Sequence, residues 1–192
     1  TSGACLLYGD AKVGKSFAAI QLALSIEQGL PWLGFPVRTQ GTVVYVQLDT
    51  PRSLWATRLA AIRVTEPAVD RLSLADRETL DTFPFDILNP HHHDLLWVAL
   101  REVQPVAVII DTIREAHSGD ENDSTTMRNV VSSLSSATHP AALIVVAHSR
   151  KSVGEHGADL ISDNRGSNYV VGRMDSIVRF TRKTAHYTGR AI

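Results

Sequence analysis

The sequence from residue 4 to residue 16 is Ala-Cys-Leu-Leu-Tyr-Gly-Asp-Ala-Lys-Val-Gly-Lys-Ser. Its first part, Ala4 to Tyr8, is a short apolar run that predicts a buried strand. Its second part, Gly9 to Ser16, has the Gly-x-x-x-x-Gly-Lys-Ser spacing of a P-loop. The glycines let the backbone curl so that successive N–H groups face one phosphate chain at a helix N-terminus. The stretch therefore predicts a nucleotide-binding turn between a strand and a helix.

Two side chains of this turn have predicted roles. Lys15 is expected to reach the terminal phosphates of ATP, and the Ser16 hydroxyl is expected to hold Mg²⁺. Asp10 stands where ParA-type ATPases have a signature lysine, which argues against that subfamily, and Lys12 is interpreted as a solvated loop residue. The residues predicted to contact the nucleotide are Gly9, Asp10, Ala11, Lys12, Val13, Gly14, Lys15, Ser16 and Phe17.

Composition limits the class of protein. The 192 residues are 44% hydrophobic and 20% charged, which predicts one ordinary globular domain over residues 1–192. No run of 18 apolar residues occurs, so no membrane span is predicted, and the single Cys5 favours a reducing, cytoplasmic compartment. The opening Thr-Ser-Gly leads straight into a strand, so we expect neither a signal peptide nor a natural N-terminus. A net charge of −1 requires any nucleic-acid contact to come from a local patch or a channel between subunits.

Strands and helices alternate along the rest of the chain. Apolar and β-branched runs predict strands at residues 4–8, 42–48, 106–110, 141–147, 176–181 and 185–188, with a short strand suggested at 83–85. Apolar residues at helical spacing predict a mostly buried helix after the P-loop, and further helices from Pro51, after His93 and around Met127. This alternation implies an α/β fold with a mostly parallel central sheet and helices on both faces.

Three consecutive histidines, His91 to His93, invite a metal interpretation. Three neighbouring side chains cannot all face one ion from regular structure, and no nearby cysteine completes a zinc site. We therefore interpret these residues as a loop that enters a helix.

Polar groups follow several predicted strands directly. The P-loop, Asp49, Asp111 and His148 each come at the end of a strand. Parallel strands present their carboxyl ends at one edge of the sheet, where ligands bind. Phosphoryl transfer from ATP to water needs charge neutralisation, a metal ion and a group that orients the water. The sequence therefore predicts an ATP-hydrolysing site at this edge.

The individual roles have alternatives. Asp111 is expected to hold Mg²⁺, usually through water, together with Ser16. Asp49 is expected to orient or deprotonate the attacking water, and its alternative is an acid favoured by the dipole of a helix N-terminus. For His148 the alternative to a functional role is a histidine satisfied at a strand end.

These residues carry a resemblance to a known family. The chain resembles the RecA-type ATPase core, and within it the RepA-like and DnaB-like hexameric replicative helicases of phage or plasmid type. The matching stretches span nearly the whole chain: the P-loop, Trp32-Leu33-Gly34-Phe35, residues 43–51 with 58–59, residues 109–112 with 121–122, residues 145–151, and residues 165–167 with Asp175.

The resemblance implies a RecA-like motor domain, excised from a longer protein, that hydrolyses ATP at the subunit interfaces of a homo-oligomer, usually a hexamer. Single-stranded DNA would run through the central channel, lined by the loops after Asp111 and His148. Arg150 and Lys151 are then the candidate DNA contacts, with an ordinary solvated pair as the alternative. Asp49 matches a catalytic carboxylate that is usually Glu, so a tighter site or slow hydrolysis is expected.

The resemblance also gives His148 the place that senses the γ-phosphate and calls for an arginine finger from the neighbouring subunit. DnaB-like relatives have a Lys-x-Arg late in the chain, which falls on Thr188-Gly189-Arg190. RepA-like relatives place the finger nearer Arg179, with a gap in the alignment. We favour Arg190.

Two other functions share part of this pattern. A non-helicase RecA-type ATPase, either a recombinase or a regulator, would have every motif described above. A P-loop small-molecule kinase would need an acceptor pocket and usually an Arg-rich lid, whereas this chain has the Asp49, Asp111 and His148 edge of a water-activating ATPase.

Overall fold

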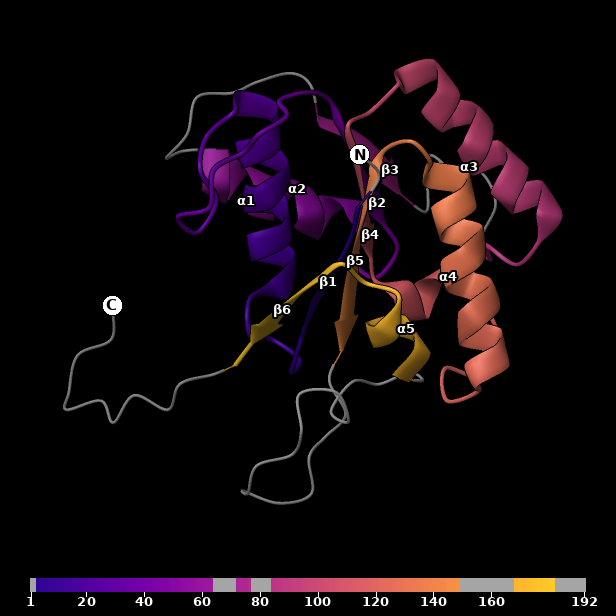
Figure 1. Cartoon of the computed structure of the whole chain (residues 1–192). Coiled ribbons are helices and arrows are strands. Elements are labelled where there is room, and N and C mark those ends of the chain that lie inside the picture. Colours follow the sequence, from indigo (N-terminus) through magenta and orange to yellow (C-terminus); the bar gives the residue numbers. More distant parts are fainter. Residues whose placement is uncertain (1–2, 64–71, 77–83, 149–167, 182–192) are drawn as a thin grey trace.

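The computed structural model describes residues 3–63, 72–76, 84–148 and 168–181, which form a central sheet with helices on both faces (Figure 1). The strands are β1 (Ala4–Gly9), β2 (Val43–Gln47), β3 (Leu72–Asp76), β4 (Ala107–Asp111), β5 (Ala142–His148) and β6 (Ser176–Phe180). They lie in the order β3-β2-β4-β5-β1-β6, and all neighbouring pairs are parallel. The predicted α/β class, with a mostly parallel central sheet and helices on both faces, is confirmed.

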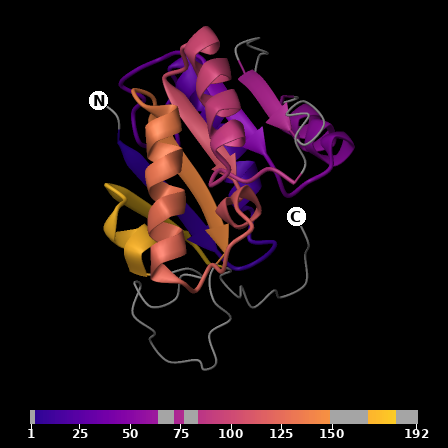
Figure 2. The ribbon, with the colours of Figure 1, turned by 90° about the vertical axis from the view of Figure 1, so that its right-hand side faces the viewer.

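Two apolar cores hold the helices against the sheet, one on each face. The helices of one face lie in front of the strands in Figure 2. The helices are α1 (Lys15–Gln28), α2 (Arg52–Arg63), α3 (Pro90–Val103), α4 (Ser124–Thr138) and α5 (Asn168–Gly172), with a short 3₁₀ helix η1 (Ile113–Ala116). Trp55 of α2 packs in one core, while Leu96 of α3 and Leu134 of α4 pack in the other. Strand residues alternate between the cores, so Leu6 belongs to one and Leu7 to the other. Burial on both faces explains the continuous apolar runs of the strands.

The strand suggested at residues 83–85 is wrong for the part that the structure describes. Pro84 and Phe85 lie in no strand, and Phe85 is instead a buried core residue beside Ile87. Its apolar character serves packing, and Pro84 has no N–H to donate to a ladder. The strand of this region is β3, which pairs with β2 and has no apolar run in its sequence.

The end of the chain is described as far as residue 181. The predicted strand at 176–181 is confirmed as β6, which pairs with β1 at one edge of the sheet. The predicted strand at 185–188 lies outside the described residues. Among the helices that the structure does describe, none is long and apolar enough to span a membrane.

Candidate nucleotide-binding site

The P-loop joins β1 to α1 by a turn that depends on two glycines. A Cβ atom at Gly9 would overlap the carbonyl oxygen of Phe180 on the neighbouring strand β6, so no other residue fits there. Gly14 caps the start of α1 with a φ of 95°, a left-handed conformation that favours glycine. The first N–H groups of α1 have no partner within the helix and face the turn, which makes this end suited to an anion.

Lys15 is the first residue of α1, and its side chain is only 5% exposed. Its Nζ atom donates to the carbonyl oxygens of Gly9 at 2.9 Å and Asp10 at 2.7 Å, and it lies 3.2 Å from Nδ1 of His148. An ammonium group only donates, so Nδ1 of His148 is the acceptor in this contact. Burial lowers the pKa of Lys15, whereas the carboxylates of Asp111, Asp10 and Asp49 act to raise it.

A cavity of about 520 Å³ opens above the P-loop, at the carboxyl ends of four adjacent strands. It is lined by Ala11, Lys12, Gly14, Lys15, Ser16, Phe17, Asp49, Thr50, Arg58, Asp111, Thr112 and His148. The predicted residues Lys15, Ser16, Asp49, Asp111 and His148 are therefore brought together in one place. Gly9, Asp10 and Val13 belong to the turn but do not line the cavity.

Asp111 ends β4 at the floor of this cavity and is 1% exposed. Its Oδ2 atom accepts a 2.6 Å hydrogen bond from the Tyr45 hydroxyl, while its Oδ1 atom is buried with no partner among the described residues. Burial raises the pKa of Asp111, and the hydroxyl groups of Tyr45 and Ser16 oppose this rise. A free carboxylate oxygen beside a serine hydroxyl fits the oxygen ligands that Mg²⁺ prefers.

Asp49 lies between β2 and α2, and its side chain is exposed at the cavity. Its backbone N–H donates to Oε1 of Gln47 at 3.2 Å, which ties the acid to the end of β2. α2 begins at Arg52, one residue later than predicted, and the Pro51 carbonyl accepts from the N–H of Trp55. Asp49 is thus on a short connection and not inside the helix.

Arg58 was not predicted as a site residue. It extends from α2 to the cavity, where Nη1 donates to the Thr50 hydroxyl at 3.2 Å and the guanidinium lies 5.8 Å from the centre of the Phe17 ring. The only sequence signal was its place in the resemblance to the helicases. Tyr45, the partner of Asp111, was also missed because an aromatic residue inside a strand is ordinary.

The remaining predicted residues are the candidate DNA contacts and the candidate arginine fingers. Arg150, Lys151 and Arg190 are outside the described residues. Arg179 is on β6, where its guanidinium lies 5.9 Å from the centre of the Tyr8 ring, and it does not line the cavity.

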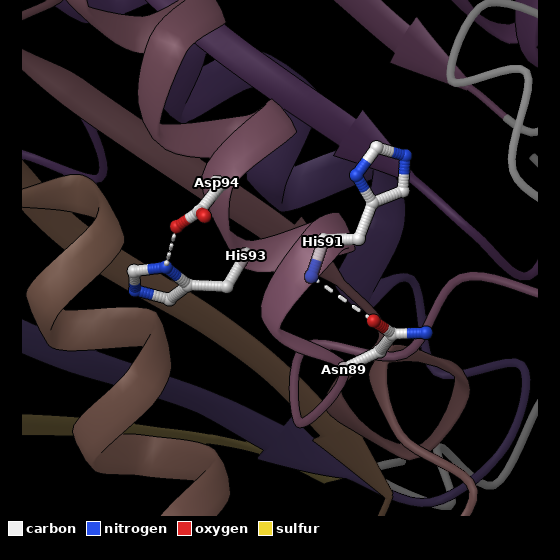
Figure 3. Close-up of polar contacts among 4 residues, drawn as sticks. All are labelled: Asn89, His91, His93 and Asp94. Atoms are coloured by element: carbon white, nitrogen blue, oxygen red, sulfur yellow. Dashed lines mark hydrogen bonds and ion pairs between the residues drawn. The ribbon is translucent and has the colours of Figure 1, made fainter.

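The three histidines begin α3, so their interpretation as a loop is wrong (Figure 3). Pro90 opens the helix, and the Asn89 side chain caps it by accepting from the His91 N–H at 3.0 Å. Figure 3 shows the rings of His91 and His93 on different sides of the helix, with His93 beside Asp94. In the described part of the chain, no three His, Cys, Asp or Glu side chains are grouped to hold a metal ion.

The segment after Asp111 is partly helical, whereas the sequence predicted only a loop. η1 is held to the connection before α3, because the Ile87 N–H donates to the Ala116 carbonyl at 2.9 Å and the Ser118 hydroxyl donates to Oδ2 of Asp86 at 2.5 Å. His117, between these contacts, is 4% exposed. Its pKa is lowered by burial and by Arg114, against the opposing effect of Asp86 and Glu121.

The buried histidine gives a pH prediction. Because the pKa of His117 is lowered in the folded protein, the unfolded chain binds more protons just below the ordinary histidine pKa of about 6.5. The contribution of neutral His117 to the free energy of unfolding is fully present above that pH and is lost as the pH falls. We expect the free energy of unfolding, measured with urea, to decline between pH 8 and pH 5 in wild type. The decline should be shallower in His117→Asn. Equal slopes in the two proteins would contradict the prediction.

Comparison with known proteins identifies the family. The sequence family described as an AAA domain matches residues 1–154. The chain belongs to this AAA-domain family. Its members are P-loop ATPases of the RecA-like superfamily, which confirms the resemblance to RecA-type ATPases at that level.

A solved structure similar to this AAA domain is that of the flagellar accessory protein FlaH from Methanocaldococcus jannaschii. The two share 12% sequence identity with a TM-score of 0.49, over 76% of this chain and 61% of FlaH. The AAA domain described here therefore spans about three fifths of the length of that protein.

Proposed function

We propose that this AAA domain binds ATP with Mg²⁺ and hydrolyses it as the motor of a ring-shaped helicase or translocase on single-stranded DNA. The observation that carries the proposal is the cavity in which Lys15, Asp49, Asp111 and His148 meet. Mg²⁺, when bound, neutralises phosphate charge, and Ser16 and Asp111 are the residues that would hold it.

The side chains divide the work of hydrolysis. Lys15 supplies a buried positive charge beside the phosphate-binding turn, and its contact with His148 links that charge to the end of β5. Asp49 is exposed to the cavity and free to orient the attacking water or to accept its proton. The water oxygen bonds to the terminal phosphorus as the bond to the leaving ADP oxygen breaks.

The ring and the DNA rest on further support. Among the described arginines only Arg58 lines the cavity, and it lies on the same subunit. A finger from a neighbouring subunit would complete the site, with Arg190 preferred and Arg179 the alternative. Arg150 and Lys151 follow β5 in the sequence, and the resemblance to the ring-shaped helicases implies that they face a common channel. A single chain of net charge −1 attracts a polyanion weakly, whereas several such pairs around one path act together.

The test combines ATPase rate with oligomeric mass. We expect the ATP-bound oligomer to hydrolyse ATP faster with single-stranded DNA, and its log affinity for DNA to fall linearly with log salt by several units. Arg150→Ala with Lys151→Ala should flatten that slope and spare basal ATPase. A monomer with salt-independent or undetectable DNA affinity would overturn the ring motor.

The finger can be tested separately by mixing variants. Arg190→Ala should lower ATPase without changing nucleotide affinity of the isolated subunit, because the finger acts across an interface. Mixed with Lys15→Ala subunits, it should regain some activity wherever an intact P-loop meets an intact arginine. Absence of rescue, with Arg179→Ala rescued in its place, would assign the finger to Arg179.

A second candidate is a non-helicase RecA-type ATPase, either regulatory or a recombinase. The observation that favours it is Asp49, an acid one methylene shorter than the usual Glu, which suits slow hydrolysis. In that case ATPase would respond little to DNA, and the oligomer would form without unwinding activity. A P-loop small-molecule kinase is less supported, because the cavity presents an exposed acid to water and has one described arginine in its lining.

A further inference from the structure

Tyr45 is a fully buried tyrosine in the middle of β2. Its ring packs against Trp55 of α2, with ring centres 5.9 Å apart. Along the sheet it stands opposite Ile109, two residues before Asp111 on β4. From there its hydroxyl reaches the end of β4 and donates to Oδ2 of Asp111 at 2.6 Å.

Packing alone does not account for the hydroxyl. Tyr45 belongs to an apolar core that also contains Val43, Ile109 and Val146. A phenylalanine would fill the same space against Trp55, and burying a hydroxyl costs free energy unless it is hydrogen-bonded. We therefore look for the role of the Tyr45 hydroxyl in its effect on its hydrogen-bond partner, Asp111.

The two oxygens of Asp111 are in different situations. Oδ2 accepts from Tyr45, while Oδ1 is buried and has no hydrogen-bond partner in the part of the chain that the structure describes. Asp111 lines the cavity beside Ser16. A hydrogen bond to one oxygen restrains the rotation of a carboxylate about its Cβ–Cγ bond, so the other oxygen keeps a fixed direction.

The geometry points to Tyr45 as a positioning residue of the magnesium site, holding Oδ2 of Asp111 so that Oδ1 remains the oxygen available to the metal and its water. This inference rests on the proposed function, because it concerns the same ATP site. A residue that hydrogen-bonds a metal-binding carboxylate without touching the metal orients that carboxylate. Loss of such a residue typically weakens metal binding about 10- to 100-fold.

The test measures nucleotide binding and metal binding, not turnover. In Tyr45→Phe, ADP affinity without metal should stay within about twofold of wild type, while the gain in affinity on adding Mg²⁺ should shrink about 10- to 100-fold. Mn²⁺ replaces Mg²⁺ for electron paramagnetic resonance, which reports the affinity of the protein–ADP complex for the metal directly. That affinity should fall by the same factor.

The matched control is Trp55→Phe, which alters the packing of the Tyr45 ring and leaves the hydroxyl in place. It should keep the wild-type dependence on Mg²⁺ and Mn²⁺. Tyr45→4-aminophenylalanine, which retains an N–H donor at the same position, should restore metal affinity and also serves if Tyr45→Phe does not fold.

The outcomes separate the two proposals. Wild-type metal dependence in a folded Tyr45→Phe protein would overturn the positioning role, as would an equal loss in Trp55→Phe or weak Mn²⁺ binding by the folded 4-aminophenylalanine variant. Wild-type protein that binds no nucleotide, with or without metal, would instead overturn the proposed ATP site itself.

Discussion

Lys15→Ala is expected to weaken the binding of MgATP by a factor of about 10² to 10⁴, because the ammonium group would make two or more charge-assisted hydrogen bonds to phosphate, each about 1.5–3 kcal/mol. The fold should remain. Lys15 is buried and hydrogen-bonded to the Gly9 and Asp10 carbonyls, and alanine removes a costly buried charge along with those bonds. Calorimetric titration with ATP and Mg²⁺ measures the loss, and thermal unfolding checks the fold.

A matched control lies three residues earlier. Lys12 also lines the cavity, but its side chain is exposed and its φ is 63°, a conformation that asparagine tolerates. Lys12→Asn should therefore keep ATP affinity within about tenfold of wild type, as for the loss of a solvated charge. If Lys15→Ala binds ATP as tightly as wild type, the P-loop assignment fails.

Asp49→Asn should preserve ATP binding and lower turnover by about 10²-fold or more, the usual cost of losing a general base or water-positioning group. Affinity for ATP should hold or rise slightly, because a negative charge is removed from the neighbourhood of the phosphates. Steady-state hydrolysis and nucleotide titration separate the two effects.

Two comparisons sharpen this test. Asp10→Asn removes a carboxylate that also acts on Lys15 but does not line the cavity, so its turnover should stay near wild type. Asp49→Glu lengthens the acid by one methylene and should keep or raise turnover if the short side chain limits hydrolysis. Full turnover in Asp49→Asn would move the role to another residue. Glu121 is a poor substitute, since it lies 3.6 Å from Arg114 and away from the cavity.

The sequence could predict that the site residues meet in one place, because each of them directly follows or ends a strand. Asp111 and His148 end apolar runs, and parallel strands bring such ends to one edge. The P-loop follows the same logic, since its glycine spacing fixes a backbone shape and not a set of contacts. These local features needed no knowledge of distant residues.

What could not be predicted depends on contacts between distant segments. Tyr45 and Arg58 look like strand and helix residues, and only the folded sheet brings one to Asp111 and the other to Thr50. The contact between Lys15 and His148 likewise joins segments that are far apart in the sequence. Phe85 led to the wrong prediction of a strand, because its apolar side chain packs in the core although the residue lies in no strand.

The close approach of Gly9 to Phe180 has a mechanical consequence. β6 is the last strand described, and the backbone of its final residue, Phe180, lies directly against Gly9, the first residue of the P-loop. There is no side chain between the two backbones to absorb a displacement. Tension applied to the chain beyond Phe180 would therefore reach the P-loop turn directly, so pulling on this end would be coupled to the release of a nucleotide from the proposed site.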